Sequence, residues 1–110
     1  MHAYWKYEMP GAQLVIGSDS SVPFNKAVAV NSAWRHAKGD IFVILDADCY
    51  LPGSVIQDCA DRIRVARKQN QKLWFVPYRY FYRLTQAATE VVLVSSPRDP
   101  YRFSDPPPLA

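Results

Sequence analysis

The chain has 110 residues, of which 49% are hydrophobic, 21% charged and 14% aromatic, and its formal net charge is +3 at pH 7. This length fits one small domain, and the composition is that of a globular protein, which excludes general disorder. A net charge of +3 does not by itself indicate nucleic-acid binding. We expect a cytoplasmic protein without a transmembrane segment, because no apolar run reaches roughly 18 residues and residues 1–6 lack the apolar core of a signal peptide.

The first segments are predicted to be a helix, a turn and a strand. Residues 1–9 are interpreted as the last turns of a helix, and Pro10–Gly11 as a turn. Gln13–Gly17 is a short apolar run after this turn, which favours a buried strand. The polar residues 18–21 then form a loop at the carboxyl end of that strand.

A helix is predicted over Lys26–Lys38, a segment without glycine or proline. Asn25 is a good N-cap, and Lys38 followed by Gly39 is typical of a helix C-terminus. The core stripe is predicted from residues at helical spacing, namely Ala27, Val30, Trp34 and Ala37.

A strand and a further helix follow. Ile41–Leu45 is apolar on both faces, as expected of a central parallel strand. Ser54 is predicted to begin the helix, with Gln57 completing a capping box. The helix is expected to have an apolar face of Val55, Ile56, Cys59, Ala60, Ile63 and Ala66 and a polar face of Asp58, Asp61, Arg62, Arg64 and Lys68. Cys49 and Cys59 are too few for a disulfide framework and are expected to be reduced thiols.

The remaining elements complete an alternating pattern. Leu73–Val76 is predicted to be a third strand, and Thr85 to cap a short helix that ends at Val94. The pattern predicts an α/β fold, a small three-layer α/β/α domain with a mostly parallel sheet over residues 1–94. Residues 95–110 form a proline-rich tail that we expect to be irregular.

Two carboxylates stand where such a sheet would bind a ligand, beyond the carboxyl end of a strand. Asp46 and Asp48 directly follow the five-residue apolar strand. The period-two geometry of an extended segment would point both side chains the same way. Such a pair suits Mn²⁺ or Mg²⁺, which prefer oxygen ligands and share them with substrate phosphates. The alternative is that one aspartate caps the next turn while the other is simply solvated.

The segment from Asn31 to Asp48 resembles the core of family 2 glycosyltransferases. It contains an asparagine, a helix ending in Ala-Lys-Gly-Asp at residues 37–40, an apolar strand and Asp-Ala-Asp at residues 46–48. A match over this whole segment is much more specific than Asp-x-Asp alone. The resemblance implies a partial GT-A (Rossmann-like) domain. It also implies metal-dependent transfer of a sugar from a nucleotide-sugar donor, usually a UDP-sugar, to an acceptor.

The resemblance also implies roles for single residues. Those expected to contact the nucleotide-sugar are Ser18, Asp19, Lys26, Asn31, Asp46 and Asp48. Asp48 would be the main metal ligand, Asp46 would contact the ribose or the metal-bound diphosphate, and Asp19 would contact the nucleoside. Ser18 stands where the family usually has another acid. For Lys26 and Asn31, the alternatives are an exposed first-turn lysine and a helix-surface asparagine.

Two parts of the family pattern are not recognised in the sequence. Nothing before Gln13 matches the family's first strand, so an unpaired sheet edge is expected, which favours self-association or a partner chain. The family's catalytic carboxylate lies in a Gly-Trp-Gly-x-Glu-Asp-like segment, and Glu90, Asp99 and Asp105 lack that context. No catalytic base is therefore assigned. We interpret the chain as the nucleotide-sugar-binding portion of such an enzyme, truncated at both ends.

Two alternatives belong to other functional classes. One is a non-catalytic nucleotide-sugar-binding module that acts with a partner chain. The other is a basic α/β domain that contacts nucleic acid. The second depends on Tyr78–Arg83, which interleaves aromatics with arginine, and on a basic cluster of Arg62, Arg64, Arg67, Lys68 and Lys72. We favour a solvated helix face for the cluster and a strand or loop covering a core edge for Tyr78–Arg83, so nucleic acid is not an expected partner.

Overall fold

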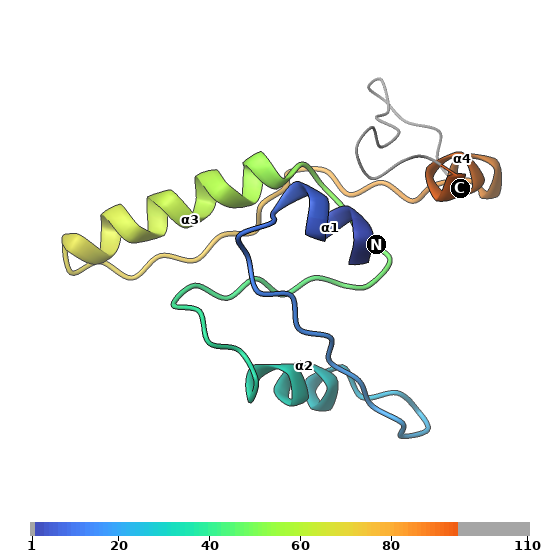
Figure 1. Cartoon of the computed structure of the whole chain (residues 1–110), viewed down its shortest axis with the longest axis horizontal. Coiled ribbons are helices and arrows are strands. Elements are labelled where there is room, and N and C mark those ends of the chain that lie inside the picture. Colours follow the sequence, from blue (N-terminus) through green and yellow to red (C-terminus); the bar gives the residue numbers. More distant parts are fainter. Residues whose placement is uncertain (1, 95–110) are drawn as a thin grey trace. The chain divides into compact units, whose positions relative to one another are not determined.

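The computed structural model describes residues 2–94, so the predicted proline-rich tail lies outside the described residues. Within them the chain forms four helices joined by irregular segments (Figure 1), namely α1 (His2–Glu8), α2 (Lys26–Trp34), α3 (Gly53–Lys68) and α4 (Gln86–Val94). The chain divides into two compact units, Met1–Leu51 with α1 and α2 and Pro52–Ala110 with α3 and α4.

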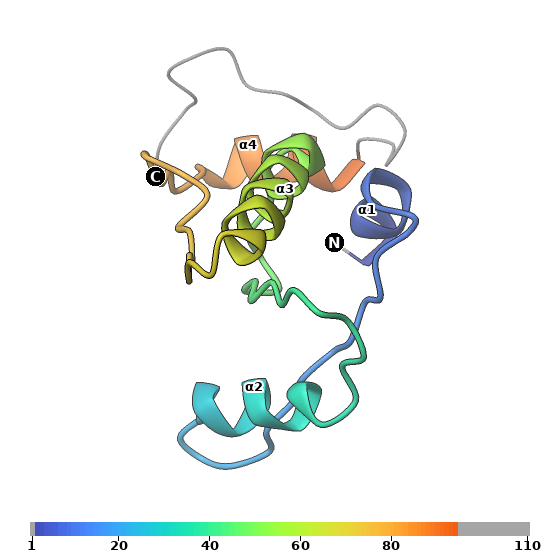
Figure 2. The same cartoon turned by 90° about the vertical axis from the view of Figure 1, so that its left-hand side faces the viewer.

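The expected three-layer α/β/α architecture with a mostly parallel sheet, and with it the GT-A fold, is wrong for residues 2–94, which contain no β-strand (Figures 1 and 2). The three segments expected to be strands are irregular and expose apolar side chains, with Ile16, Ile44 and Trp74 at 73%, 67% and 82%. An apolar run predicts burial, but it does not supply the neighbouring strand that the N–H and C=O groups of a ladder need. The unpaired sheet edge has no counterpart in these residues either.

α1 forms where helical turns were predicted and contributes the most buried aromatic side chains of the first unit. Tyr4 and Trp5 are 6% and 7% exposed, and their ring centroids lie 5.0 Å apart in an edge-on arrangement. The Tyr4 hydroxyl donates a hydrogen bond to the Leu51 C=O at 2.8 Å, and its ring lies 5.5 Å from that of Tyr50. These contacts tie the end of the first unit to its beginning.

α2 begins at the predicted cap. Asn25 Oδ1 accepts a hydrogen bond from the Val28 N–H at 3.2 Å, which satisfies one of the amides left without a partner at a helix N-terminus. The predicted core stripe is wrong, because no sheet covers it in the described residues. Ala29 is the buried residue of α2, whereas Trp34 is 57% exposed and packs against the Phe42 ring at 4.3 Å.

α2 ends at Trp34 and does not continue to the predicted Lys38. The side chain of Gln13 reaches the segment after the helix, where its Nε2 donates to the His36 C=O at 2.9 Å and its Oε1 accepts from the Lys38 N–H at 2.8 Å. In a longer helix these two groups would bond to backbone four residues away. The Gln13 amide replaces that further turn, so Gly39 is not the C′ residue of the helix.

Gly17 lies directly against α2. A Cβ at this position would overlap the carbonyl oxygen of Ala29 and would lie 3.1 Å from the Ala33 Cβ. Beside it, the Ser18 N–H donates to Ser32 Oγ at 3.2 Å, and that hydroxyl donates to the Ala29 C=O at 2.7 Å. The segment expected to be a strand is therefore held to a helix by polar contacts.

α3 confirms the predicted amphipathic pattern. Ile56 and Ala66 on its apolar face are only 4% and 3% exposed, and the residues predicted for its polar face are exposed. The helix begins at Gly53 without a side-chain cap, so the capping box predicted for Ser54 and Gln57 is wrong.

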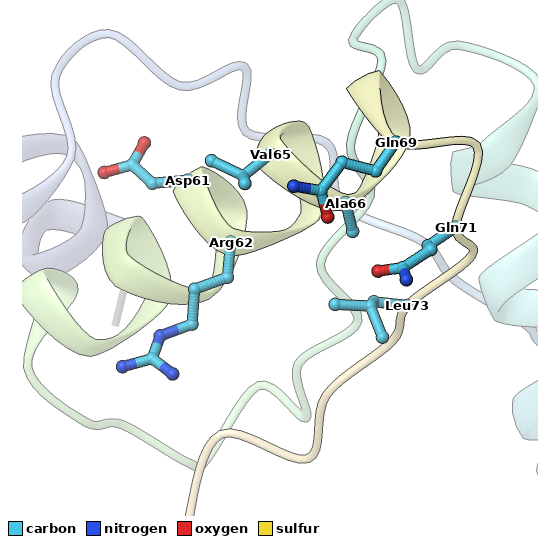
Figure 3. A pocket seen from close by; sticks show the side chains of 7 residues that line it. All are labelled: Asp61, Arg62, Val65, Ala66, Gln69, Gln71 and Leu73. Carbon is cyan, nitrogen blue, oxygen red and sulfur yellow. The ribbon is translucent and has the colours of Figure 1, made fainter.

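The end of α3 reverses the chain. Asn70 has a φ of 56°, its N–H donates to the Arg67 C=O at 3.1 Å, and the Gln71 N–H donates to the Ala66 C=O at 2.9 Å. These two bonds and the left-handed residue between them form a Schellman motif, in which asparagine tolerates the conformation that glycine usually adopts. Leu73 then lines a groove of about 310 Å³ beside α3 (Figure 3).

Thr85 is the predicted cap of α4, and the structure confirms it. Thr85 Oγ1 accepts a hydrogen bond from the Ala88 N–H at 3.1 Å. Ala88 is the buried residue of this helix, while Leu93 and Val94 at its end are exposed. None of the helices in residues 2–94 has the length and hydropathy to cross a membrane.

Candidate functional site

The predicted carboxylate pair lies in a β-turn. The Cys49 N–H donates to the Asp46 C=O at 3.1 Å, so Asp46 and Asp48 take the first and third positions of a four-residue turn. Both side chains are exposed. The extended geometry expected at these residues is wrong, because the backbone already turns at Ala47 and Asp48.

Lys26 is the cation that meets this turn. Its Nζ lies 2.7 Å from Asp46 Oδ1, with side-chain exposures of 63% and 52%. Lys26 is also the first residue of α2, where the free amides of the helix carry partial positive charge. The structure thus brings together two of the residues predicted to contact the nucleotide-sugar. The sequence carried no signal for this pairing.

Asp19 shapes the loop before α2. Its Oδ2 accepts from the Asn25 N–H at 2.8 Å, and its Oδ1 accepts from the Ser21 hydroxyl at 2.8 Å. These bonds, chiefly the one from the Asn25 amide, lower the pKa of Asp19 below its ordinary value of 3.8, so the side chain is a carboxylate at neutral pH. Asp19 therefore links the loop to the N-cap of α2, a structural role that the sequence did not indicate.

Ser18 and Asn31 are the predicted contacts that do not bond to the Lys26–Asp46 pair in the described residues. The Ser18 backbone bonds to Ser32 Oγ through its N–H at 3.2 Å and its C=O at 3.4 Å. Asn31 is exposed on α2. Within residues 2–94, neither side chain forms a hydrogen bond to Lys26 or Asp46.

Cys49 is a free thiol beside the pair, and Cys59 in α3 is also free, as expected of reduced cysteines. Cys49 Sγ lies 3.7 Å from Asp48 Oδ1. Burial, followed by the negative charges of Asp48 and Asp46, raises the pKa of Cys49 above its ordinary 9.0. The thiol is therefore neutral at pH 7 and a poor nucleophile. The groups of this turn that could bind a cation are the carboxylates of Asp46 and Asp48.

Residues 16–102 match the model of the family described as Glycosyl transferase family 2. The chain belongs to this family. The matched residues include every residue predicted to contact the nucleotide-sugar, and the membership supports a glycosyltransferase-like function with a nucleotide-sugar donor and an acceptor as substrates. Searches of curated proteins and of solved structures returned no match.

Asp46 and Asp48 supply carboxylate oxygens from one turn, which is the ligand type that a divalent cation prefers. Mg²⁺ is commonly held by one or two carboxylates together with substrate phosphates, and this family member supplies two carboxylates in one turn. Among residues 2–94, no group of three or more histidine, cysteine, aspartate or glutamate side chains gathers.

The basic cluster at the end of α3 belongs to the second unit and confirms the predicted solvated helix face. Arg62 Nε lies 3.1 Å from Asp58 Oδ2, and Arg64 Nη1 lies 3.6 Å from Asp61 Oδ1, both within the same helix. The interpretation of Tyr78–Arg83 as a strand or loop that covers a core edge is wrong, because its aromatic side chains are exposed on irregular backbone.

Proposed function

We propose that Lys26, Asp46 and Asp48 bind the diphosphate of a UDP-sugar together with Mn²⁺ or Mg²⁺, as the donor site of a sugar transfer. The observation that carries this proposal is the 2.7 Å contact between Lys26 Nζ and Asp46 Oδ1. It joins an ammonium group, a helix N-terminus and a carboxylate pair within the residues matched to the family. A diphosphate is attracted by the first two groups, and its metal ion by the third.

The roles of the two carboxylates differ. Asp48 Oδ1 accepts a weak bond from the Cys49 thiol at 3.7 Å, whereas Asp46 Oδ1 faces Lys26. We therefore assign the main metal contact to Asp48. Because the Lys26–Asp46 pair is exposed, exchanging it for a contact between Lys26 and phosphate costs little free energy. Asp46 is then available to the ribose or to the cation.

Asp19 and the bound cation complete the proposed site. The carboxylate of Asp19 accepts hydrogen bonds within the loop and keeps acceptor capacity that a nucleoside hydroxyl can use. A divalent cation, when bound, neutralises the charge that develops on a diphosphate leaving group. Ser18 in the loop and Asn31 on α2 remain proposed contacts of the nucleotide-sugar.

Isothermal titration calorimetry with UDP-glucose, in the presence and absence of Mn²⁺, tests the proposal. We expect binding that requires Mn²⁺, that is lost in Asp48→Asn, and that weakens at least about tenfold in Lys26→Gln, a loss typical of a charge-assisted hydrogen bond. Asp58→Asn and Lys38→Gln are the matched controls, because they remove the same charges elsewhere on the surface. Binding that survives in Asp48→Asn contradicts the proposal.

Donor hydrolysis separates a transferase from a non-catalytic binding module. No catalytic base is assigned to this chain. Glu90 accepts a hydrogen bond from Gln86 Nε2 at 3.2 Å on α4, and Asp99 and Asp105 lie outside the described residues. Release of UDP from UDP-glucose by the chain with Mn²⁺, abolished in Asp48→Asn, supports an enzyme. Tight binding without UDP release supports the module.

A further inference from the structure

The residues from Arg62 to Arg83, here called the basic-aromatic segment, carry an unbalanced charge. No aspartate or glutamate occurs between Asp61 and Glu90. The cations of the segment are Arg62, Arg64, Arg67, Lys68 and Lys72, followed by Arg79 and Arg83. Two of the arginines pair with acids of α3, while Lys68 and Lys72 lie exposed on either side of the chain reversal. The segment is therefore a concentrated positive surface in a chain of modest net charge.

The same segment exposes large apolar and aromatic side chains. Trp74 is 82% exposed, Tyr80 65%, Phe81 62%, and Val76 and Tyr78 55% each. Leaving such area in water is unfavourable, and grouped exposed apolar residues mark interaction surfaces. Arginine is interleaved among the rings, with the Arg79 guanidinium carbon 5.7 Å from the Tyr80 ring centroid.

The Schellman motif at Asn70 brings the helical and irregular parts of the segment together. After the reversal, Leu73 lines the same groove as Val65 and Arg62 of α3 (Figure 3). The irregular part therefore begins beside the basic half of the helix, and the chain turns back along α3 in Figure 1. Arg62 and Leu73 thus line one groove of the second unit together with Asp61, and the exposed aromatic residues follow Leu73 directly along the chain.

We propose that the basic-aromatic segment binds the surface of an anionic lipid bilayer. Lysine and arginine attract acidic headgroups, tryptophan and tyrosine rings are favoured at headgroup depth, and apolar side chains such as Val76 and Phe81 enter the acyl boundary. A single-stranded nucleic acid would use the cations and the ring faces but would leave the exposed aliphatic side chains in water. The combination of charge and aliphatic exposure therefore favours the membrane.

Co-sedimentation of the full chain with vesicles of phosphatidylcholine and phosphatidylserine tests this proposal. We expect binding to the mixed vesicles and not to phosphatidylcholine alone. The double variant Lys68→Gln/Lys72→Gln should bind about fivefold more weakly per cation removed, and Trp74→Ala should also bind more weakly. Lys6→Gln/Lys38→Gln removes the same charge from the first unit and should bind as the unsubstituted chain does. All these side chains are exposed, and circular dichroism confirms that each variant folds.

Three outcomes overturn the proposal. They are equal binding to neutral vesicles, an equal loss in the Lys6→Gln/Lys38→Gln control, and binding of a single-stranded oligonucleotide without binding of vesicles. The last outcome would identify a nucleic-acid surface. Asp48→Asn should keep full vesicle binding, because the carboxylate pair belongs to the first unit. Vesicle binding and UDP-glucose binding are therefore measured independently, and the failure of one proposal can be told from the failure of the other.

Discussion

Different kinds of polar contact stabilise the two units, each within itself. In Met1–Leu51, side chains bond to residues far away in the sequence, as Gln13 does to His36. Among the described residues of the second unit, the side-chain bonds of Gln57 with Asp61 and of Gln86 with Glu90 join neighbours on one helix. Each long-range contact fixes two segments at once, whereas a local bond supports only its own helix. The first unit, which carries the proposed donor site, should therefore be more sensitive to single substitutions.

The largest effect is expected from Gly17→Ala in the first unit. The added Cβ would overlap the Ala29 carbonyl oxygen and crowd Ala33, so the segment must move away from α2. We expect a loss of about 1–3 kcal/mol in the free energy of unfolding, measured by chemical denaturation. Gly11→Ala is the matched control, because a Cβ there meets nothing within 4 Å. Equal stability of the two variants would contradict the close contact with α2.

Asn70→Ala probes the one left-handed residue of the described second unit. At a φ of 56°, Asn70→Gly should keep or raise stability because glycine has no Cβ to strain in this conformation, whereas Asn70→Ala loses the polar side chain that helps asparagine to adopt it and should be the less stable of the two variants. The measurement is thermal unfolding followed by circular dichroism. If the alanine and glycine variants are equally stable, the reversal after α3 does not depend on the left-handed residue. The second unit then tolerates substitutions better than we infer.

Asn25→Ala removes the cap of α2. Ser54→Ala is its counterpart, because Ser54 resembles a cap only in the sequence. Loss of the bond to the Val28 N–H should cost about 1 kcal/mol. Ser54→Ala should leave stability within about 0.5 kcal/mol, because α3 has no side-chain cap. A clear destabilisation by Ser54→Ala in chemical denaturation would reverse this assignment.

Asp19→Asn is expected to have a smaller effect that depends on pH. The Asn25 amide and the Ser21 hydroxyl lower the pKa of Asp19 below its ordinary 3.8. The unsubstituted chain is therefore stabilised relative to the variant above about pH 4, and this advantage is lost as the pH falls through the lowered pKa. Chemical denaturation at a series of pH values measures the difference, and Ser21→Ala should reduce it in part. Stability curves that stay parallel into acid would show that Asp19 does not make these bonds.

The smallest effect on stability is expected from breaking the Lys26–Asp46 pair. Both side chains are more than half exposed, so a double-mutant cycle of Lys26→Gln and Asp46→Asn should give a coupling energy of about 0.5 kcal/mol or less. A contact that adds so little stability can be exchanged for a contact with a ligand. A coupling energy above about 2 kcal/mol would identify the pair as a structural contact of the first unit.

Local patterns in the sequence predicted some parts of the molecule well. Asn25 and Thr85 cap their helices as expected, and the apolar face of α3 contains Ile56 and Ala66 as predicted. These features depend on residues within one or two helical turns of each other. The predicted strands are different, because Ile41–Leu45 becomes a strand only beside another strand, and its own composition cannot provide one.

In the candidate site, too, some features follow from the sequence and others only from the fold. The family motif that ends in Asp46 and Asp48 is a property of the sequence, and it identified both the carboxylates and the family. The β-turn between them, the bonds that Asp19 makes to the loop, and the contact of Lys26 with Asp46 depend on how the chain is folded.

The sequence by itself therefore determined the N-caps of α2 and α4, the amphipathic face of α3 and the presence of the carboxylate pair, because each of these depends on a short stretch of chain. Only the tertiary structure decided that Gln13 bonds to the segment after α2, that Gly17 lies against Ala29, and that the cation meeting Asp46 is Lys26. Contacts of this kind require two distant segments to come together, and that is decided by the path of the whole unit.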